Sequence, residues 1–367
     1  MRFVIARGVC PAVLLVLSIG CSQEPAPPPP PAPSASPTAS ALSTIKGPRL
    51  YVSDEKGGRV VVVDLSTGQV AGSLAVGKRP RGVSLSRDGS QLFVALSGSP
   101  IAGPGVDESK LPPADRAADG IGVIDLATGQ VVRKLKAGQD PESFDLSPDD
   151  ATLYASNEET AELSFVDVKT GEVTKRVKVG EEPEGVRVRP GGREVYVTCE
   201  GDNAVFAVDT ASGKVIARLR VGGRPRSILF TANGRTGFVT NENDGTVSVI
   251  DTASHRVTKT IKLPPVEGAP TAPRPMGLAL STDGAHVFVS LGRAKSIAVI
   301  DAVNYKVLRT LRDIGDRPWG IAVSGDGHSL YTANGPSADV SVLDLASGTV
   351  TRRVNTGGSP WGLVVGK

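Results

Sequence analysis

A unit of about 42 residues recurs seven times between residue 49 and the C-terminus of this chain of 367 residues, and no other feature constrains the fold as strongly. Each copy contains a predicted strand that ends on a four-residue segment beginning with Tyr or Phe. These segments lie at residues 51–54, 93–96, 154–157, 196–199, 238–241, 288–291 and 331–334. Repetition at such a period is typical of proteins that assemble copies of one small structural unit.

Two further positions recur in every unit. An alternating apolar strand closes on an aspartate just before a tight turn, and later a proline is followed two positions on by Gly or Ser. The aspartates are Asp64, Asp125, Asp167, Asp209, Asp251, Asp301 and Asp344. The prolines are Pro80, Pro141, Pro183, Pro225, Pro275, Pro318 and Pro360. Because an aspartate that occurs in every copy serves the turn of every copy, we interpret all seven as structural rather than catalytic.

Four short strands per unit, with no helical period, are typical of a β-propeller blade. The sequence therefore predicts an all-β fold, a seven-bladed β-propeller over residues 48–367. The array begins in the second strand of a blade and ends in a first strand at residues 360–366. We expect this C-terminal strand to pair beside residues 49–53, so that the N-terminal blade is completed from both ends of the chain and the ring has no open edge.

The repeated segments also resemble those of a known family. YVSD at residues 51–54, YVTC at 196–199 and FVTN at 238–241 are similar to the YVTN-type β-propeller repeats of bacterial and archaeal secreted proteins. The resemblance covers residues 49–367 and implies the propeller fold, but fold alone does not imply function. Related propellers include sugar-lactone hydrolases and companions of quinoprotein dehydrogenases that use pyrroloquinoline quinone. No residue of this sequence indicates either activity.

The first 20 residues have the pattern of a signal peptide. Arg2 and Arg7 precede an apolar run at residues 9–17, which is too short to span a bilayer. LSIGC at residues 17–21 resembles the cleavage box of bacterial lipoproteins. This resemblance implies that Cys21 is lipidated and becomes the N-terminus, and that Ser22 directs the protein to the outer membrane. An ordinary secretory signal with an incidental cysteine is the alternative.

Residues 21–47 form a predicted disordered tether rich in Pro, Ala and Ser. We therefore expect a protein of the cell envelope that faces the periplasm, touches the membrane through its lipid anchor only and has a monomeric propeller. Without Arg2 and Arg7, the 41 basic residues become 39 against 38 acidic ones, a balance that indicates no nucleic-acid partner. Cys199 is the one cysteine in the propeller, so no intramolecular disulfide can form.

The residue after each repeated proline is expected at one end of the central channel, and this ring is the best site candidate in the sequence. In ring order it comprises Arg81, Glu142, Glu184, Arg226, Met276, Trp319 and Trp361. Residues before the prolines extend the ring with Arg79, Arg274 and Arg317. The sequence predicts an acidic arc and a basic arc around the opening. Met276 excepted, we interpret these residues as candidates for binding a ligand or a partner.

The acidic arc is a candidate calcium site. Glu142 and Glu184 would supply carboxylate oxygens, and Glu158, Glu159 and Glu200 follow the second strands of neighbouring blades. A solvated rim in which these carboxylates pair with arginines is the alternative. The identity of any other cofactor stays open.

Trp319 and Trp361 are the two tryptophans of the chain and occupy matching positions of successive blades. They are candidates for a platform on which a flat ligand stacks, or for an anchor of a protein partner. Packing at the rim is the alternative. Inside the channel, Asp145 and Arg187 occupy matching positions of adjacent blades and are expected to pair.

Two insertions, residues 97–119 and 264–274, lengthen the second and fifth repeats and map to the face that carries the rim. Binding residues are frequent in loops that a rigid scaffold displays. A neutral surface excursion is the alternative interpretation of the first insertion.

The sequence offers little for catalysis. Its histidines, His255, His286 and His328, lie at predicted turns, and neither Gly-x-Ser-x-Gly nor His-Glu-x-x-His occurs. We therefore favour a non-catalytic, lipid-anchored propeller that binds a protein partner of the cell envelope or a small ligand at the face with the central opening. An accessory role in periplasmic quinoprotein oxidation, which depends on pyrroloquinoline quinone, and a metal-assisted lactonase-like hydrolase are the two alternatives.

Overall fold

The computed structural model describes residues 47–101 and 110–366. The predicted signal peptide, the lipidation site Cys21 and almost the whole predicted tether lie outside these residues, as does part of the first insertion. In the described part of the chain, no helix has the length and the apolar character that a membrane span requires.

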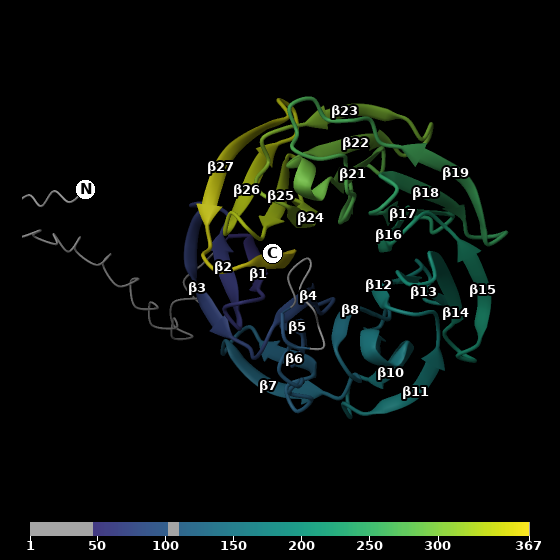
Figure 1. Ribbon diagram of the computed structural model, residues 1–367. Coiled ribbons are helices and arrows are strands. Elements are labelled where there is room, and N and C mark those ends of the chain that lie inside the picture. The colour runs from purple at the N-terminus through teal and green to yellow at the C-terminus, as the bar shows by residue number, and fades with distance from the viewer. Residues whose placement is uncertain (1–46, 102–109, 367) are drawn as a thin grey trace, which may run out of the picture. The chain divides into compact units, whose positions relative to one another are not determined.

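Seven four-stranded antiparallel sheets form a ring around a central channel, as the repeat predicts (Figure 1). The innermost strands are β4 (Pro80–Leu85), β8 (Pro141–Leu146), β12 (Pro183–Val188), β16 (Pro225–Phe230), β20 (Leu278–Leu280), β24 (Pro318–Val323) and β28 (Pro360–Gly366). The second strands are β1 (Arg49–Asp54), β5 (Gln91–Leu96), β9 (Thr152–Asn157), β13 (Glu194–Cys199), β17 (Thr236–Asn241), β21 (His286–Ser290) and β25 (Ser329–Asn334).

The two outer strands of each blade follow in chain order. The third strands are β2 (Arg59–Asp64), β6 (Gly120–Asp125), β10 (Glu162–Asp167), β14 (Ala204–Asp209), β18 (Thr246–Asp251), β22 (Ile297–Asp301) and β26 (Asp339–Asp344). The outermost strands are β3 (Gln69–Ala75), β7 (Gln130–Leu135), β11 (Val173–Lys178), β15 (Val215–Arg220), β19 (Arg256–Lys262), β23 (Val307–Leu311) and β27 (Thr349–Asn355). Two 3₁₀ turns, η2 (Glu158–Thr160) and η3 (Gly292–Ala294), follow the second strands of their blades.

The ring closes through the predicted pairing of the two ends of the repeat array. β28 pairs antiparallel with β1, and Gly366 lies opposite Arg49 in this register. The Asp54 carboxylate accepts a hydrogen bond from the Ser359 backbone N–H at 2.7 Å. The seventh sheet has the order β28-β1-β2-β3, so it contains both ends of the described propeller.

The repeated aspartates hold the turns between third and fourth strands. Asp64 Oδ1 accepts hydrogen bonds from the Ser66 backbone N–H at 2.8 Å and from the Ser66 hydroxyl at 2.6 Å. Comparable hydrogen bonds from the turns lower the pKa of all seven aspartates. Their structural interpretation is therefore confirmed.

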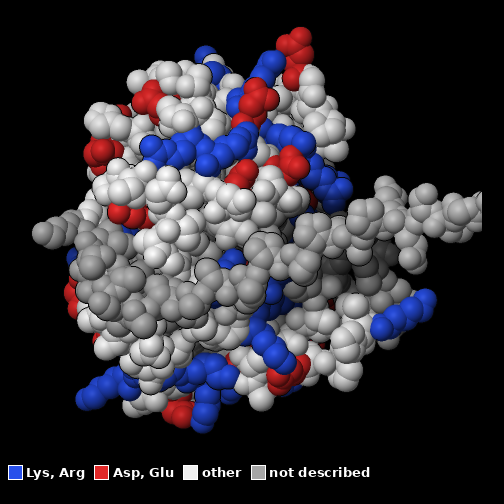
Figure 2. Space-filling model, turned by 90° about the vertical axis from the view of Figure 1, so that its left-hand side faces the viewer, with Lys and Arg blue, Asp and Glu red and all other residues white. Residues whose placement is uncertain are grey.

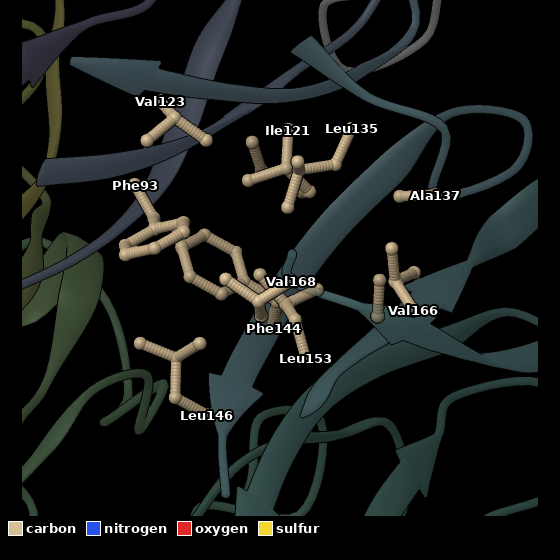
Figure 3. Packing of buried hydrophobic residues seen from close by; sticks show 12 residues of the cluster. Phe93, Ile121, Val123, Leu135, Ala137, Phe144, Leu146, Leu153, Val166 and Val168 are labelled. Atoms are coloured by element: carbon tan, nitrogen blue, oxygen red, sulfur yellow. The ribbon is translucent and has the colours of Figure 1, made fainter. Parts of the chain in front are cut away.

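Apolar side chains fill the space between neighbouring blades. Between the first two complete blades, Phe93 of β5 and Ile121 of β6 pack with Phe144 of β8 and Leu153 of β9 (Figure 3). Corresponding clusters lie between the other blades. Each sheet thus buries both faces, which explains why its central strands are nearly continuous apolar runs.

A hydroxyl group bridges each of five blades to the next one. Thr198 of β13 accepts a hydrogen bond from the Gly185 N–H of its own blade at 2.8 Å and donates one to the Arg226 carbonyl of the next blade at 2.9 Å. The hydroxyls that donate to the next blade in this way belong to Ser53, Ser156, Thr198, Thr240 and Ser290. Ala95 and Ala333 occupy this position in the other two blades.

The same carbonyls explain why Gly stands two positions after the proline in most blades. A Cβ atom on Gly185 would lie 2.3 Å from the Arg226 carbonyl oxygen, and one on Gly277 would lie 2.3 Å from that of Trp319. Both distances are shorter than any ordinary contact. Close approach of the next blade therefore requires a very small residue at this position.

Deletion of residues 359–367 removes β28 and should unfold or oligomerise the propeller, because β1 then presents an unpaired edge to solvent. We expect loss of the cooperative thermal transition in circular dichroism, or elution above monomer size in gel filtration. Removal of Lys367 alone is the control and should have no effect. A monomeric deletion variant with the melting temperature of the intact protein would contradict the proposed closure.

Candidate functional site

The rim of the channel is built where each innermost strand begins. In five blades, the residue after the proline has its carbonyl held by a hydroxyl of the preceding blade, as described above for Arg226. The residue before the proline adopts a left-handed backbone conformation in five blades, a conformation that residues other than glycine rarely adopt. These residues are Arg79, Asp140, Glu182, Arg224 and Arg317, with φ between 45° and 55°. The sharp turn lets the side chains on both sides of a proline reach the rim.

The first charged group of the rim surrounds Arg81. Its side chain is 1% exposed and forms ion pairs with Asp140 and Glu142 of the neighbouring blade. Burial alone would raise the pKa of Asp140, but the charge of Arg81 and hydrogen bonds from nearby serines outweigh it and lower that pKa. In contrast, burial and the charge of Glu184 raise the pKa of Glu158 to about 7.

The second charged group surrounds Arg226, which is also buried. Arg226 lies 2.9 Å from a carboxylate oxygen of Glu184 and 3.0 Å from one of Glu242, and it also pairs with Glu200. Arg224 approaches Glu200 to 2.6 Å. Burial and the charge of Glu184 raise the pKa of Glu200 to about 8, although both arginines oppose this shift.

The structure corrects the expectation of separate acidic and basic arcs. Arg81 lies among acidic side chains of the next blade, and Arg226 lies among three glutamates. The physical reason is that burying a charge without a partner is very costly, so the two signs interleave. Pairing with arginine was the alternative expectation, but the central pairs are buried rather than solvated.

The carboxylates proposed as calcium ligands fall into different groups. Among the described residues, Asp140, Glu142 and Glu158 place one oxygen each within 4.8 Å of one another. Glu184 pairs with Arg226, and Glu159 pairs with Arg116 of the first insertion at 2.6 Å. A cation at the three-carboxylate group would compete with the Arg81 guanidinium. Calcium binding at Glu142 and Glu184 stays a prediction.

The other half of the rim is aromatic. Trp319 and Trp361 stack with ring centroids 5.4 Å apart and planes inclined by 27°. The guanidinium carbons of Arg226 and Arg317 lie 4.8 Å and 4.7 Å from the Trp319 ring centroid. Met276 is buried beside this half, whereas both tryptophans keep partly exposed surface.

The expected contact between Asp145 and Arg187 is found, and Arg79 and Arg274 form ion pairs that were not predicted. Asp145 and Arg187 approach to 3.8 Å inside the channel, where they line a cavity of about 170 Å³. Arg79 pairs with Glu55 at 2.8 Å, and Arg274 pairs with Glu242 at 3.4 Å.

Both insertions reach the rim face, as predicted. In the first one, Asp115 pairs with Lys78 at 2.6 Å and Asp119 accepts a hydrogen bond from the Asp140 N–H at 3.2 Å. The second one ends at Arg274, which pairs with Glu242 at the rim.

Glu242 and Glu55 were not recognised as rim residues from the sequence. Both directly follow the Tyr/Phe segment of a second strand, the position that Glu158 and Glu200 occupy in their blades. A glutamate at this repeat position, together with an arginine beside the proline of the next blade, is the signal that would have identified them.

Comparison with known families identifies the fold family. The family described as YNCE-like beta-propeller matches residues 174–366, which is more than half of the chain. This chain belongs to the YNCE-like beta-propeller family. The family described as Choice-of-anchor I domain matches residues 50–217 of the same propeller. No curated protein matches the chain.

Solved structures similar to this YNCE-like propeller span several activities. Hydrazine synthase of Kuenenia stuttgartiensis is 21% identical over 81% of this chain and 92% of that chain, with a TM-score of 0.69. The periplasmic gluconolactonase PpgL of Pseudomonas aeruginosa is 21% identical over 87% and 99%, with a TM-score of 0.70. A functionally unknown protein from Desulfotomaculum acetoxidans is 15% identical over 86% and 98%, also with 0.70. At these identities the likeness shows the fold alone.

The pH dependence of stability of the YNCE-like propeller should have two limbs. Glu158 and Glu200 have folded pKa values of about 7 and 8, above the ordinary value of 4.5, so the folded state binds their protons more tightly. The free energy of unfolding should therefore rise as pH falls from about 8 to about 5. The turn aspartates have folded pKa values below 3.8, so stability should fall again as pH drops below about 4.

Urea unfolding at pH 8, 5 and 3 measures both limbs. The double variant Glu158→Gln with Glu200→Gln should flatten the limb between pH 8 and 5 and keep the acid limb. Equal stability of the unmodified protein at pH 8 and 5, or an unchanged slope in the double variant, would contradict the assignment of raised pKa values to these two residues.

Proposed function

We propose that this protein is a non-catalytic binding propeller that recognises a protein partner or a ligand at the Trp319–Trp361 half of the rim. One observation carries the proposal. In the charged half, Arg81 and Arg226 are buried and satisfied by carboxylates, so these groups maintain the fold. The stacked tryptophans and Arg317 keep exposed surface on the same face. Partly exposed tryptophan and arginine side chains are typical anchors of binding sites.

The composition of the outer sides of the ring makes them weaker candidates for a binding site than the rim. On the side that Figure 2 shows, basic and acidic side chains are interspersed among uncharged ones. Large apolar side chains that are exposed on the described blades occur alone, such as Val303 after β22, or as two consecutive residues, such as Val131 and Val132 of β7. Scattered apolar residues of this kind are normal on a protein surface and do not mark an interface.

The lipoprotein interpretation of residues 1–21 completes the proposal. It rests on the sequence pattern alone and would anchor the propeller in the cell envelope through a tether. An anchored binding module of this kind needs no catalytic residues, in keeping with the poor catalytic inventory of the chain.

A lactonase-like hydrolase is the second candidate, because Asp140, Glu142 and Glu158 converge. Three carboxylates could hold a metal ion that polarises a lactone carbonyl. The similar PpgL structure is a gluconolactonase, but its likeness concerns the fold alone. The ion pairs from Arg81 to Asp140 and Glu142 count against this candidate, because they already use the oxygens that a metal would need.

Site-specific photo-crosslinking in cells tests the binding proposal. A photoreactive residue at position 316, which is half exposed and directly precedes Arg317, should yield a discrete adduct, whereas one at position 303, which is 74% exposed on the outer part of a blade, should not. The adduct should disappear when Trp319→Ala and Trp361→Ala are combined, since the anchors of the site are then lost.

Equal adducts from positions 316 and 303, or an adduct that survives the loss of both tryptophans, would contradict binding at this half of the rim. Calcium-dependent lactone hydrolysis that Glu142→Gln abolishes would favour the hydrolase instead.

A further inference from the structure

The charges around Trp319 do not balance. Three carboxylates, from Glu184, Glu200 and Glu242, face this part of the opening. Five arginines lie there: Arg224, Arg226, Arg274, Arg293 and Arg317. The aromatic half of the rim therefore carries two more positive than negative charges.

The surplus positive charge belongs to two arginines. Arg224, Arg226 and Arg274 each pair with a carboxylate, but Arg293 and Arg317 have no carboxylate partner among the described residues. Arg293 belongs to η3, which contacts β24, and Arg317 directly precedes that strand. Burial lowers the pKa of the Arg317 guanidinium; the charge of Glu242 opposes this shift, and those of Arg226 and Arg293 add to it. Glu242 itself pairs with Arg224, Arg226 and Arg274, so Arg317 has a carboxylate in the vicinity but no ion pair of its own within the described part of the chain.

The stacked tryptophans indicate the shape of a ligand that could bring a negative charge to these arginines. The Arg317 guanidinium lies over the Trp319 ring, and Trp361 stacks on the same indole. Flat unsaturated groups pack favourably against such rings in offset stacking. A flat cation could also interact with indole rings, but here it would meet two unpaired arginines. The combination of rings and surplus arginine favours a flat anion.

We propose that the rim binds a carboxylate or phosphate attached to a flat, unsaturated ring, with the anion held by Arg317 and Arg293 and the ring stacked on the tryptophan pair. This inference rests on the proposed function, because it names the ligand chemistry of the same half of the rim. Arginine is suited to this role because its planar fork can donate two parallel hydrogen bonds to a carboxylate or phosphate.

Intrinsic fluorescence gives a direct test, because both tryptophans of the chain belong to this site. Benzoate and phenyl phosphate serve as flat anions, benzamidine as a flat cation of nearly the same shape, and inorganic phosphate as an anion without a ring. We expect saturable changes in tryptophan fluorescence of the intact protein with the two flat anions and none with benzamidine or inorganic phosphate.

Two matched variants locate the anion. Arg317→Gln should weaken benzoate binding by about tenfold or more, the effect expected for loss of a charge-assisted hydrogen bond. Arg187→Gln removes an arginine that lines the channel beyond the rim and should leave the affinity within about twofold, the scatter expected between equivalent proteins. Trp319→Phe should retain binding and leave Trp361 as the single reporter.

The outcomes separate this proposal from the proposed function. Benzamidine that binds as tightly as benzoate, or an affinity for benzoate that Arg317→Gln leaves unchanged, would overturn the anion site. If no flat anion binds while the crosslinked adduct from position 316 persists, the anion site is wrong and partner binding at the rim stands. If both the flat anions and the crosslinking fail, neither proposal holds.

Discussion

A side-chain hydroxyl that joins one blade to the next is the interaction on which the rest of this propeller depends. It accepts a hydrogen bond from the innermost strand of its own blade and donates one to the carbonyl of the first rim residue in the following blade, as Thr198 does between Gly185 and Arg226. Because both partners are buried backbone groups, each bridge satisfies two polar groups that would otherwise be costly. At five of the seven seams the backbone of the rim is consequently held by the neighbouring blade, and Trp319 of the candidate site projects from a rim segment fixed in this way.

The distribution of charge on that ring follows from its burial. Arg81 and Arg226 are almost fully covered, and both are surrounded by carboxylates from adjacent blades. The Arg226 group crosses the seam that Thr198 also bridges, whereas the Arg81 group crosses the seam at Ala95, where no hydroxyl is present. Pairing ends at Trp319 and Trp361, where the side chains are partly exposed and two arginines lack a carboxylate among the described residues. The candidate site is the part of the rim where arginine and tryptophan side chains are not fully occupied by contacts within the fold.

Most of the architecture could be predicted from the sequence, because the length of the repeat, its order of strands and the points where the array begins and ends are visible there. The number of blades, the closure by β28 and β1, the turn aspartates and the contact between Asp145 and Arg187 are confirmed. The two tryptophans stack on each other, but their role as a platform or an anchor stays a prediction. The charge pattern was wrong, because long arginine side chains reach carboxylates whose distance no repeat position specifies. Glu242 was missed although it occupies the repeat position of Glu158 and Glu200. The lipid on Cys21 and calcium at Glu142 and Glu184 stay predictions.

The free energy of unfolding of two single variants tests the central role of the hydroxyl bridge most directly. Thr198→Val keeps the shape of the side chain but leaves the Gly185 N–H and the Arg226 carbonyl without their partner, so it should lower the stability by about 1–3 kcal/mol. Ala95 occupies the same position in β5, with the same register between its two innermost strands, but offers no hydroxyl. Ala95→Ser should therefore supply the missing bridge and raise the stability by up to about 1 kcal/mol. A neutral Thr198→Val together with a destabilising Ala95→Ser would contradict the account.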